Sequence, residues 1–216
     1  MDGHRQYFIE ALKHHYPETF DEIVAETDHH FRSICAGNNF LTRSRNPLDK
    51  RLEFSSYFLA LIMTIDVRGE TFESIRKICL EIVTSYVSPK NKVHLLLKRL
   101  PAKLANTWLA NIFIRSFNKR LVQNTNPEGF VARIITDKRE TFGLGYGIDI
   151  LECGICKLFK KHHYEKYASI LCEVDAITSR IAGLVLVRMG TIANGATKCD
   201  FRFKKISDVV SGKNEC

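Results

Sequence analysis

The chain has 216 residues, of which 45% are hydrophobic and 26% are charged. This length and this balance are typical of one globular domain with its own core, and they exclude an intrinsically disordered chain. The formal net charge of +8 is spread along the sequence among acidic residues. That distribution argues against a nucleic-acid partner and suits the attraction of a small anionic substrate.

The N-terminus carries no apolar signal-peptide core. The longest apolar run, 57–65, is far shorter than the roughly 20 residues of a membrane span. The sequence contains seven cysteines, an odd number that does not suit a closed disulfide framework. We therefore expect a cytoplasmic protein with reduced thiols and without a membrane partner.

The first part of the chain has the apolar spacing of helices. Predicted helices lie, in chain order, around 7–12, from 18 towards 34, over 48–65, over 72–87, over about 92–99 and from 101 to about 117. Thr71 is placed to cap the helix over 72–87, and Pro89 ends it. Turn-forming residues predict a loop over 36–46.

Three pairs of adjacent histidines occur in the chain: His14-His15, His29-His30 and His162-His163. Neighbouring residues on a helix point about 100° apart, so two adjacent imidazoles do not readily bind one ion. We interpret all three pairs as surface features.

The pattern changes at a turn cluster over 124–129. Predicted strands follow over 130–136, 142–152, 184–189 and 200–205, with helices over 157–161 and 165–179 between them. Phe201 and Phe203 share one face of the last strand with Cys199, while Arg202 shares the other face with Asp200 and Lys204.

These elements predict an α+β fold in which an N-terminal helical layer leads into a small antiparallel or mixed sheet with one or two covering helices. We expect a single domain over 1–216, with a mainly helical part over 1–123, a sheet-containing part over 124–206 and a polar, frayed tail over 207–216. Apolar residues on the amphipathic helices are compatible with a homo-oligomer.

Glycines at 143, 145 and 147 resemble part of a dinucleotide-binding loop, but a strand pattern follows them where that motif needs a helix. We therefore interpret them as a bulged strand segment and predict no cofactor. Cys153 and Cys156 have the spacing of a redox pair or half a zinc site. Cys153 ends a strand and Cys156 starts a helix, where thiol pKa values fall, so reactive thiols and small buried residues are both open interpretations.

Two further segments carry chemistry. Cys172 and Asp175 are three residues apart on a predicted helix, so they project from one face, and a carboxylate on a packed face is costly unless it is paired or used. The stretch 188–203 is the richest in polar side chains. Its candidates are Arg188, Thr191, Asn194, Gly195, Cys199, Asp200 and Arg202. Backbone amides around Gly195 are candidates to hold an anionic group or a developing oxyanion.

The order of Cys153-x-x-Cys156-x-x-Phe159, Leu171-Cys172-Glu173-x-Asp175, Gly190-Thr-Ile-Ala-Asn-Gly195 and Cys199-Asp-Phe-Arg-Phe203 resembles the L-2-amino-thiazoline-4-carboxylic acid hydrolase family. The helical N-terminal part is compatible with that family too. The resemblance implies a hydrolase that opens a cyclic amidine to a carbamoyl-cysteine by C–N hydrolysis, on a bacterial route to cysteine.

The residues allow more than one route for such a reaction. Cys199 or Cys153 is a candidate thiolate nucleophile, and Asp175 or Asp200 is a candidate base for a water molecule. Arg188 or Arg202 would hold the substrate carboxylate, with Thr191, Asn194, Gly195 and Cys172 lining the substrate site.

Two other functions stay open from the sequence. The chain lacks a complete Ser-His-Asp, Cys-His or metal-hydrolase motif, which favours a small-molecule-binding or sensing module. The alternative is a metal-binding protein that uses Cys153, Cys156, Cys172 and Cys199 as ligands, whereas the hydrolase reading needs no metal.

Overall fold

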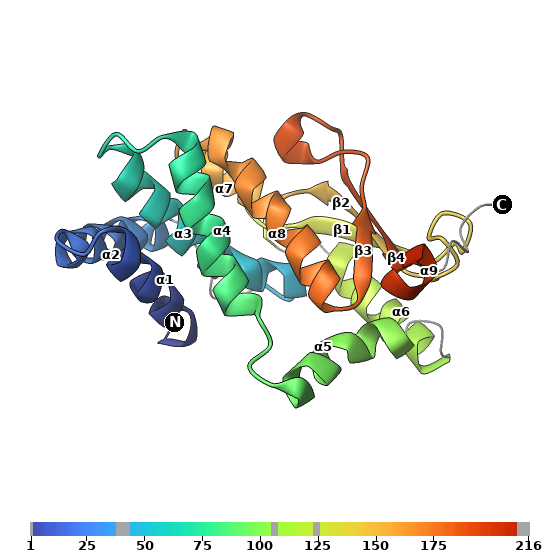
Figure 1. Ribbon diagram of the computed structural model, residues 1–216. Coiled ribbons are helices and arrows are strands. Elements are labelled where there is room, and N and C mark those ends of the chain that lie inside the picture. The colour runs from blue at the N-terminus through green and yellow to red at the C-terminus, as the bar shows by residue number, and fades with distance from the viewer. Residues whose placement is uncertain (1, 38–43, 105–107, 123–125, 211–216) are drawn as a thin grey trace. The chain divides into compact units, whose positions relative to one another are not determined.

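A computed structural model describes residues 2–37, 44–104, 108–122 and 126–210 of the chain (Figure 1). It confirms the α+β class, with many helices and a four-stranded antiparallel sheet. The chain forms two compact units. The first consists of 1–87, 125–129 and 154–174, and the second of 88–124, 130–153 and 175–216. The units therefore do not coincide with the helical and strand-rich parts of the sequence.

The first unit is helical. It contains α1 (Asp2–His15), α2 (Phe20–Ala36), η2 (Pro47–Asp49), α3 (Lys50–Asp66), α4 (Phe72–Val87), α7 (Gly154–Lys161), η3 (Glu165–Tyr167) and the first half of α8 (Ala168–Ile181). The start of α8 is tied to α4 by an ion pair in which Arg76 donates from Nε to Glu173 over 2.7 Å.

Helix α3 is the centre of this unit. Its apolar residues lie on all sides of the helix, a pattern that fits a helix surrounded by others. Phe58 packs against the rings of Phe8 and Phe54 at 4.7 and 4.9 Å between centroids. These tilted and edge-on aromatic contacts, together with fully buried Leu59 and Leu61, make this the main core of the unit.

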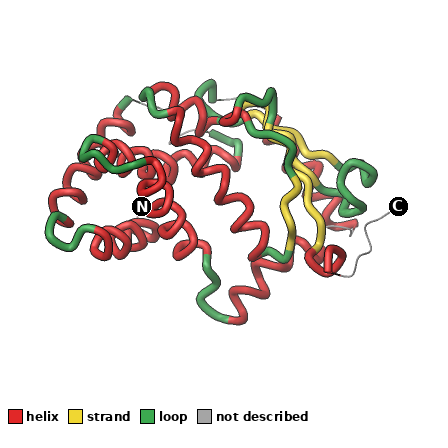
Figure 2. The backbone as a smooth tube through the Cα atoms, turned by 45° about the horizontal axis from the view of Figure 1, so that its top comes forward, coloured by secondary structure: helices red, strands yellow, loops and turns green. Residues whose placement is uncertain are grey.

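The second unit contains the sheet. Its elements are α5 (Lys92–Leu104), α6 (Trp108–Val122), β1 (Val131–Ile135), β2 (Gly147–Glu152), the second half of α8, β3 (Leu184–Val187), η4 (Ile192–Asn194), β4 (Cys199–Lys205) and α9 (Ile206–Val210). The strand order is β1-β2-β4-β3, and every neighbouring pair is antiparallel. Figure 2 shows the strands in yellow. Strand β4, which comes last in the chain, thus lies in the interior of the sheet.

Most predicted elements are confirmed within a few residues. The Thr71 hydroxyl accepts a hydrogen bond from the Ser74 amide at 3.2 Å, as expected of the residue that caps α4. The glycine-rich segment before β2 is a turn in which Phe142, Gly143 and Gly145 have positive φ, and a strand follows it rather than a helix. The bulged strand predicted for Gly143 and Gly145 is therefore wrong: their positive φ forms a turn, and the strand predicted over 142–152 begins only at Gly147.

Two further boundaries differ from the prediction. Pro101 lies inside α5 instead of starting the next helix, which is α6 from Trp108. The start of the predicted tail forms α9, whose first amide, that of Ile206, bonds to the Gly183 carbonyl at 3.1 Å. Most of the loop predicted over 36–46 and the end of the tail lie outside the described residues.

In the part of the chain that the structure describes, no helix is long and apolar enough to cross a membrane. Exposed apolar side chains do occur on α5, where four of them recur at helical spacing: Val93, Leu96, Leu97 and Leu100.

Two leucine substitutions test this account of the core. Leu61 is 0% exposed and Leu97 is 60% exposed. We expect Leu61→Ala to lower the free energy of unfolding by about 2–5 kcal/mol, because it leaves a cavity in the packed centre of α3. Leu97→Ala should change it by less than about 0.5 kcal/mol. Urea unfolding followed by circular dichroism measures both, and equal effects would contradict the assignment of α3 as the core.

Candidate active site

The register between β2 and β4 decides which side chains meet. Ile150 pairs with Cys199, and Asp149 pairs with Asp200. Residues of β4 alternate in burial, with Cys199, Phe201 and Phe203 buried, as the sequence predicts for their shared face. The sheet of the second unit therefore has a face with a thiol and aromatic rings and a face with charged groups.

Cys199 lies on the aromatic face at the start of β4 and is buried. Its Sγ accepts a hydrogen bond from the Ile192 amide at 3.2 Å. Cys153, which directly follows β2, is also buried and lies near enough to act electrostatically on the Cys199 thiol. The structure thus brings together two of the sequence-predicted thiols.

The pKa of Cys199 is raised above its ordinary value. Burial is the main cause, because it disfavours the charged thiolate. The hydrogen bond from Ile192 and the positive charge of Arg188 act in the opposite direction, while Cys153 and Asp175 add to the rise. At neutral pH Cys199 is therefore a thiol, and it needs a base before it can attack.

An ion pair lies beside this thiol. Arg188, which follows β3, donates from Nη1 to Oδ2 of Asp175 on α8 at 3.2 Å, and both side chains are largely buried. The guanidinium of Arg188 also lies over the Phe201 ring, 5.1 Å from its centroid. A buried carboxylate on this helix is thus paired, as the sequence argument requires, and its partner is a predicted substrate-binding residue.

The loop before β4 is held by its own backbone. Thr191 is buried and caps η4, and its hydroxyl accepts from the Asn194 amide at 3.2 Å. Gly195 has a φ of 86°, which favours glycine. The amides of Asn194, Gly195 and Ala196 all bond to carbonyls within the loop. These amides are therefore engaged inside the loop and do not point to a substrate oxyanion, the role predicted for them from the sequence.

Asp200 anchors the other end of this loop. Its carboxylate accepts hydrogen bonds from the amides of Met189, at 3.1 and 3.2 Å, and Gly190, at 3.0 Å. A carboxylate with this many backbone donors holds a turn in place. Of the two aspartates proposed as bases, Asp175 is the one beside the thiol.

The charged face of the sheet carries a second cluster, centred on buried Asp149 of β2. Its carboxylate oxygens lie 2.8 Å from Lys198 Nζ, 3.1 Å from Arg133 Nη2 and 3.0 Å from Arg202 Nη1. Arg202, a predicted substrate-binding residue, also pairs with Glu140 at 3.4 Å. It therefore belongs to a structural ion cluster on the face opposite Cys199.

Sequence reasoning missed Asp149. Burial opposes its ionisation, but hydrogen bonds from Lys198, Arg133 and Arg202 outweigh that effect and hold the pKa of the carboxyl below its ordinary value. The signal that was available is its position in the middle of an otherwise apolar strand pattern.

The remaining predicted cysteines lie in the first unit. Cys156 is on α7 and Cys172 is on α8, and both are half-buried. Among the described residues, one group of metal-binding side chains has its ligand atoms close together: His14, His15 and Glu81. This group contains none of the four cysteines considered as metal ligands.

Comparison with known proteins gives one family. Residues 53–203 match the model of the L-2-amino-thiazoline-4-carboxylic acid hydrolase family, and the match includes Cys153, Asp175, Arg188 and Cys199. The chain belongs to this family, as the sequence resemblance implied. No curated protein and no solved structure gives a significant match.

The electrostatics of Cys199 can be measured by alkylation. We expect its rate of reaction with iodoacetamide to rise with pH, with a midpoint above the roughly 8.5 of an ordinary thiol. Asp175→Asn should lower that midpoint, because it removes a negative charge. Arg188→Met should raise it, because it removes a positive one. Peptide mass spectrometry resolves Cys199 from the other cysteines.

Cys35 of α2 lies in the other unit, so its alkylation midpoint should be the same in both variants and in the unaltered chain. A general loosening of the structure would instead lower the Cys199 midpoint in both variants towards that of an ordinary thiol. An Arg188→Met midpoint below that of the unaltered chain, with Cys35 unchanged, would contradict the account.

Proposed function

We propose that this chain is a hydrolase that opens a small cyclic amidine, such as 2-amino-thiazoline-4-carboxylate, to a carbamoyl-cysteine. The observation that carries the proposal is the cluster of Cys199, Asp175 and Arg188 in one buried region of a chain that belongs to this hydrolase family. The cluster supplies a nucleophile, an acid–base group and a cation for the substrate carboxylate.

Arg188 is the proposed anchor for the substrate. A guanidinium binds a carboxylate through two parallel hydrogen bonds, and here it already pairs with one carboxylate, that of Asp175. A substrate carboxylate that takes a share of Arg188 weakens this pair. Asp175 is then released from part of its ion pair, and its carboxylate becomes available to accept a proton.

The proposed nucleophile is Cys199. It transfers its proton to Asp175, and its sulfur adds to the amidine carbon of the ring. The tetrahedral centre collapses with loss of one ring bond, and the departing ring atom takes the proton from Asp175. Water then adds to the same carbon and displaces the Cys199 sulfur, which regains a proton. The exocyclic nitrogen stays on the carbamoyl product, so the sum is one substrate plus one water.

The broken ring bond decides the product. Cleavage of the C–N bond leaves the carbamoyl group on sulfur, whereas cleavage of the C–S bond leaves it on nitrogen and releases a free thiol. The two carbamoyl-cysteines have equal mass, and a thiol reagent distinguishes them.

A route through water is the second version of this proposal. Asp175 is the base in that case, and Cys199 lines the site without forming a bond to the substrate. The raised pKa of Cys199 favours this version, since a buried neutral thiol is a weak nucleophile.

The alternative function is a small-molecule-binding module without turnover. The observation in its favour is that the amides of Asn194, Gly195 and Ala196 bond within their own loop. A tetrahedral oxyanion would then depend on other donors.

Turnover of 2-amino-thiazoline-4-carboxylate by the purified, reduced chain tests the proposal. We expect carbamoyl-cysteine by mass spectrometry, with kcat lowered at least about 100-fold in Asp175→Asn, because both routes need its carboxylate. Cys199→Ala separates the routes, since it abolishes turnover only if sulfur attacks the ring. Arg188→Lys should raise KM more than it lowers kcat, because it removes a bidentate contact.

Cys35→Ser is the control for the loss of a thiol outside the cluster. Cys35 is half-buried and far from the cluster in sequence, so this variant should keep full activity. Absence of turnover in folded protein that still binds the substrate would favour the binding module. Full activity in Asp175→Asn would remove this cluster from the reaction.

A further inference from the structure

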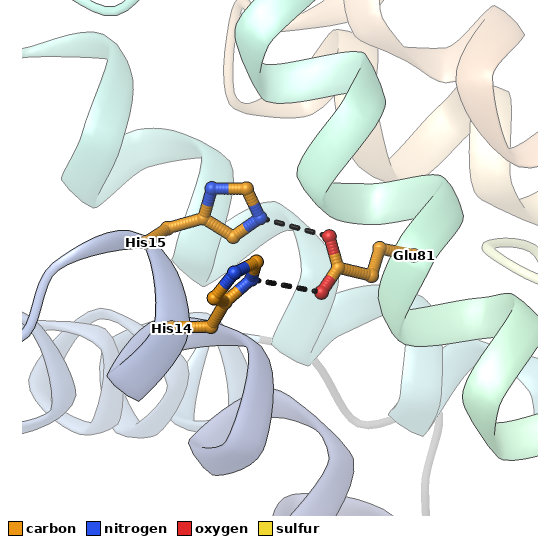
Figure 3. Close-up of side chains that lie close together, drawn as sticks. All are labelled: His14, His15 and Glu81. Atoms are coloured by element: carbon orange, nitrogen blue, oxygen red, sulfur yellow. Dashed lines mark hydrogen bonds and ion pairs between the residues drawn. The ribbon is translucent and has the colours of Figure 1, made fainter.

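Two histidines and a glutamate of the first unit lie close together, and all three are far from the Cys199 cluster in sequence. His14 and His15 end α1, and Glu81 lies on the neighbouring helix α4 (Figure 3). His15 Nε2 lies 2.8 Å from Oε2 of Glu81, and His14 Nδ1 lies 3.5 Å from Oε1. One ligand atom from each of the three residues falls within 4.8 Å of the other two.

The convergence differs from what the sequence predicts for adjacent histidines. Their side chains leave the helix about 100° apart, but Glu81 faces both rings from the neighbouring helix and offers one carboxylate oxygen to each (Figure 3). The ring centroids are 4.9 Å apart. The third ligand therefore comes from a residue 66 positions along the chain from His15, which no local pattern shows.

The donor set suits zinc. Two imidazoles and one carboxylate form a recurrent set of three protein ligands for Zn²⁺, with a further position left to water. Bonds of about 2.0–2.1 Å in a tetrahedron place ligand atoms roughly 3.3 Å apart. One ligand atom from each of the three residues already lies within 4.8 Å of the other two, so a modest rotation of the side chains brings them to that separation.

The exposure of the two histidines also suits a metal site. The side chain of His15 is 20% exposed, whereas that of His14 is 74% exposed, so solvent and ions reach the site from the His14 side. Helices α1 and α4 pack against each other within one unit, so the positions of the ligands are fixed by the fold.

We propose that His14, His15 and Glu81 bind a zinc ion that joins α1 to α4. This site is independent of the proposed hydrolase activity. The two histidines precede the segment 53–203 that matches the family, whereas Glu81 lies within it, so the matched region alone does not supply the three ligands. The site is open to solvent on the side of His14. Water would therefore fill the remaining coordination positions of the metal.

Zinc titration of the full-length chain tests the proposal. Protein stripped with a chelator competes with a chromophoric zinc indicator, and we expect one equivalent bound at this site. His15→Ala and Glu81→Gln should each weaken that binding by about tenfold or more, since even the loss of an outer-shell partner costs 10–100-fold. Zinc should also raise the melting temperature of the unaltered chain, and this rise should be absent in both variants.

The chain offers a matched control. His29 and His30 form a second adjacent pair, on α2, with ring centroids 6.1 Å apart and outside the closely placed ligand group. The double variant His29→Ala, His30→Ala should bind zinc like the unaltered chain. Both ligand variants should melt like the unaltered chain without zinc, which excludes misfolding as the cause of lost binding.

Free cysteines also bind zinc, and Co²⁺ distinguishes them. Cobalt bound by His14, His15 and Glu81 gives visible d–d absorption without a sulfur-to-metal charge-transfer band. Visible bands lost in Glu81→Gln, with no charge-transfer band, support the proposal. Equal zinc affinity in the unaltered chain, His15→Ala and Glu81→Gln overturns it, as does no zinc binding by the unaltered chain.

Discussion

The antiparallel pairing of β2 with β4 is the constraint on which the candidate site depends. Side chains of a strand alternate between its two faces, so a slip of one residue would turn Cys199 to the charged face and Asp200 to the aromatic one. The observed register pairs Ile150 with Cys199 and Asp149 with Asp200. It thereby places the thiol beside Phe201 and next to Cys153 at the end of β2.

Charge on the opposite face reinforces this register. Buried Asp149 forms ion pairs with three cations: Lys198, which directly precedes β4, Arg202 of β4, and Arg133 of β1. A slip of the strands would leave a buried carboxylate without these partners, at a cost of several kcal/mol. The same cluster keeps Arg202 away from Cys199, so the arginine beside the thiol is Arg188 of the β3–β4 connection.

The local pattern of the sequence was enough for most of the fold. The alternation of 199–205 predicts which face Cys199 occupies, and the spacing of 72–87 with Thr71 predicts α4 and its cap. Sequence spacing also singled out Cys153, Asp175, Arg188 and Cys199, which meet in one cluster.

The parts that sequence did not predict depend on contacts between distant residues. Three cations surround Asp149 only because the strands adopt the order β1-β2-β4-β3. The internal bonding of the loop around Gly195 depends on backbone angles that composition does not specify. The approach of Glu81 to His14 and His15 depends on the packing of α1 against α4.

Both faces of the sheet carry arginine, and the central claim is that the substrate uses the face with Cys199. A crystal structure of Cys199→Ala with bound 2-amino-thiazoline-4-carboxylate tests this claim most directly. The account predicts the substrate carboxylate on the guanidinium of Arg188, with the amidine carbon directed at position 199 and near Asp175. A substrate bound instead on Arg202 and Lys198, at the charged face, would contradict it.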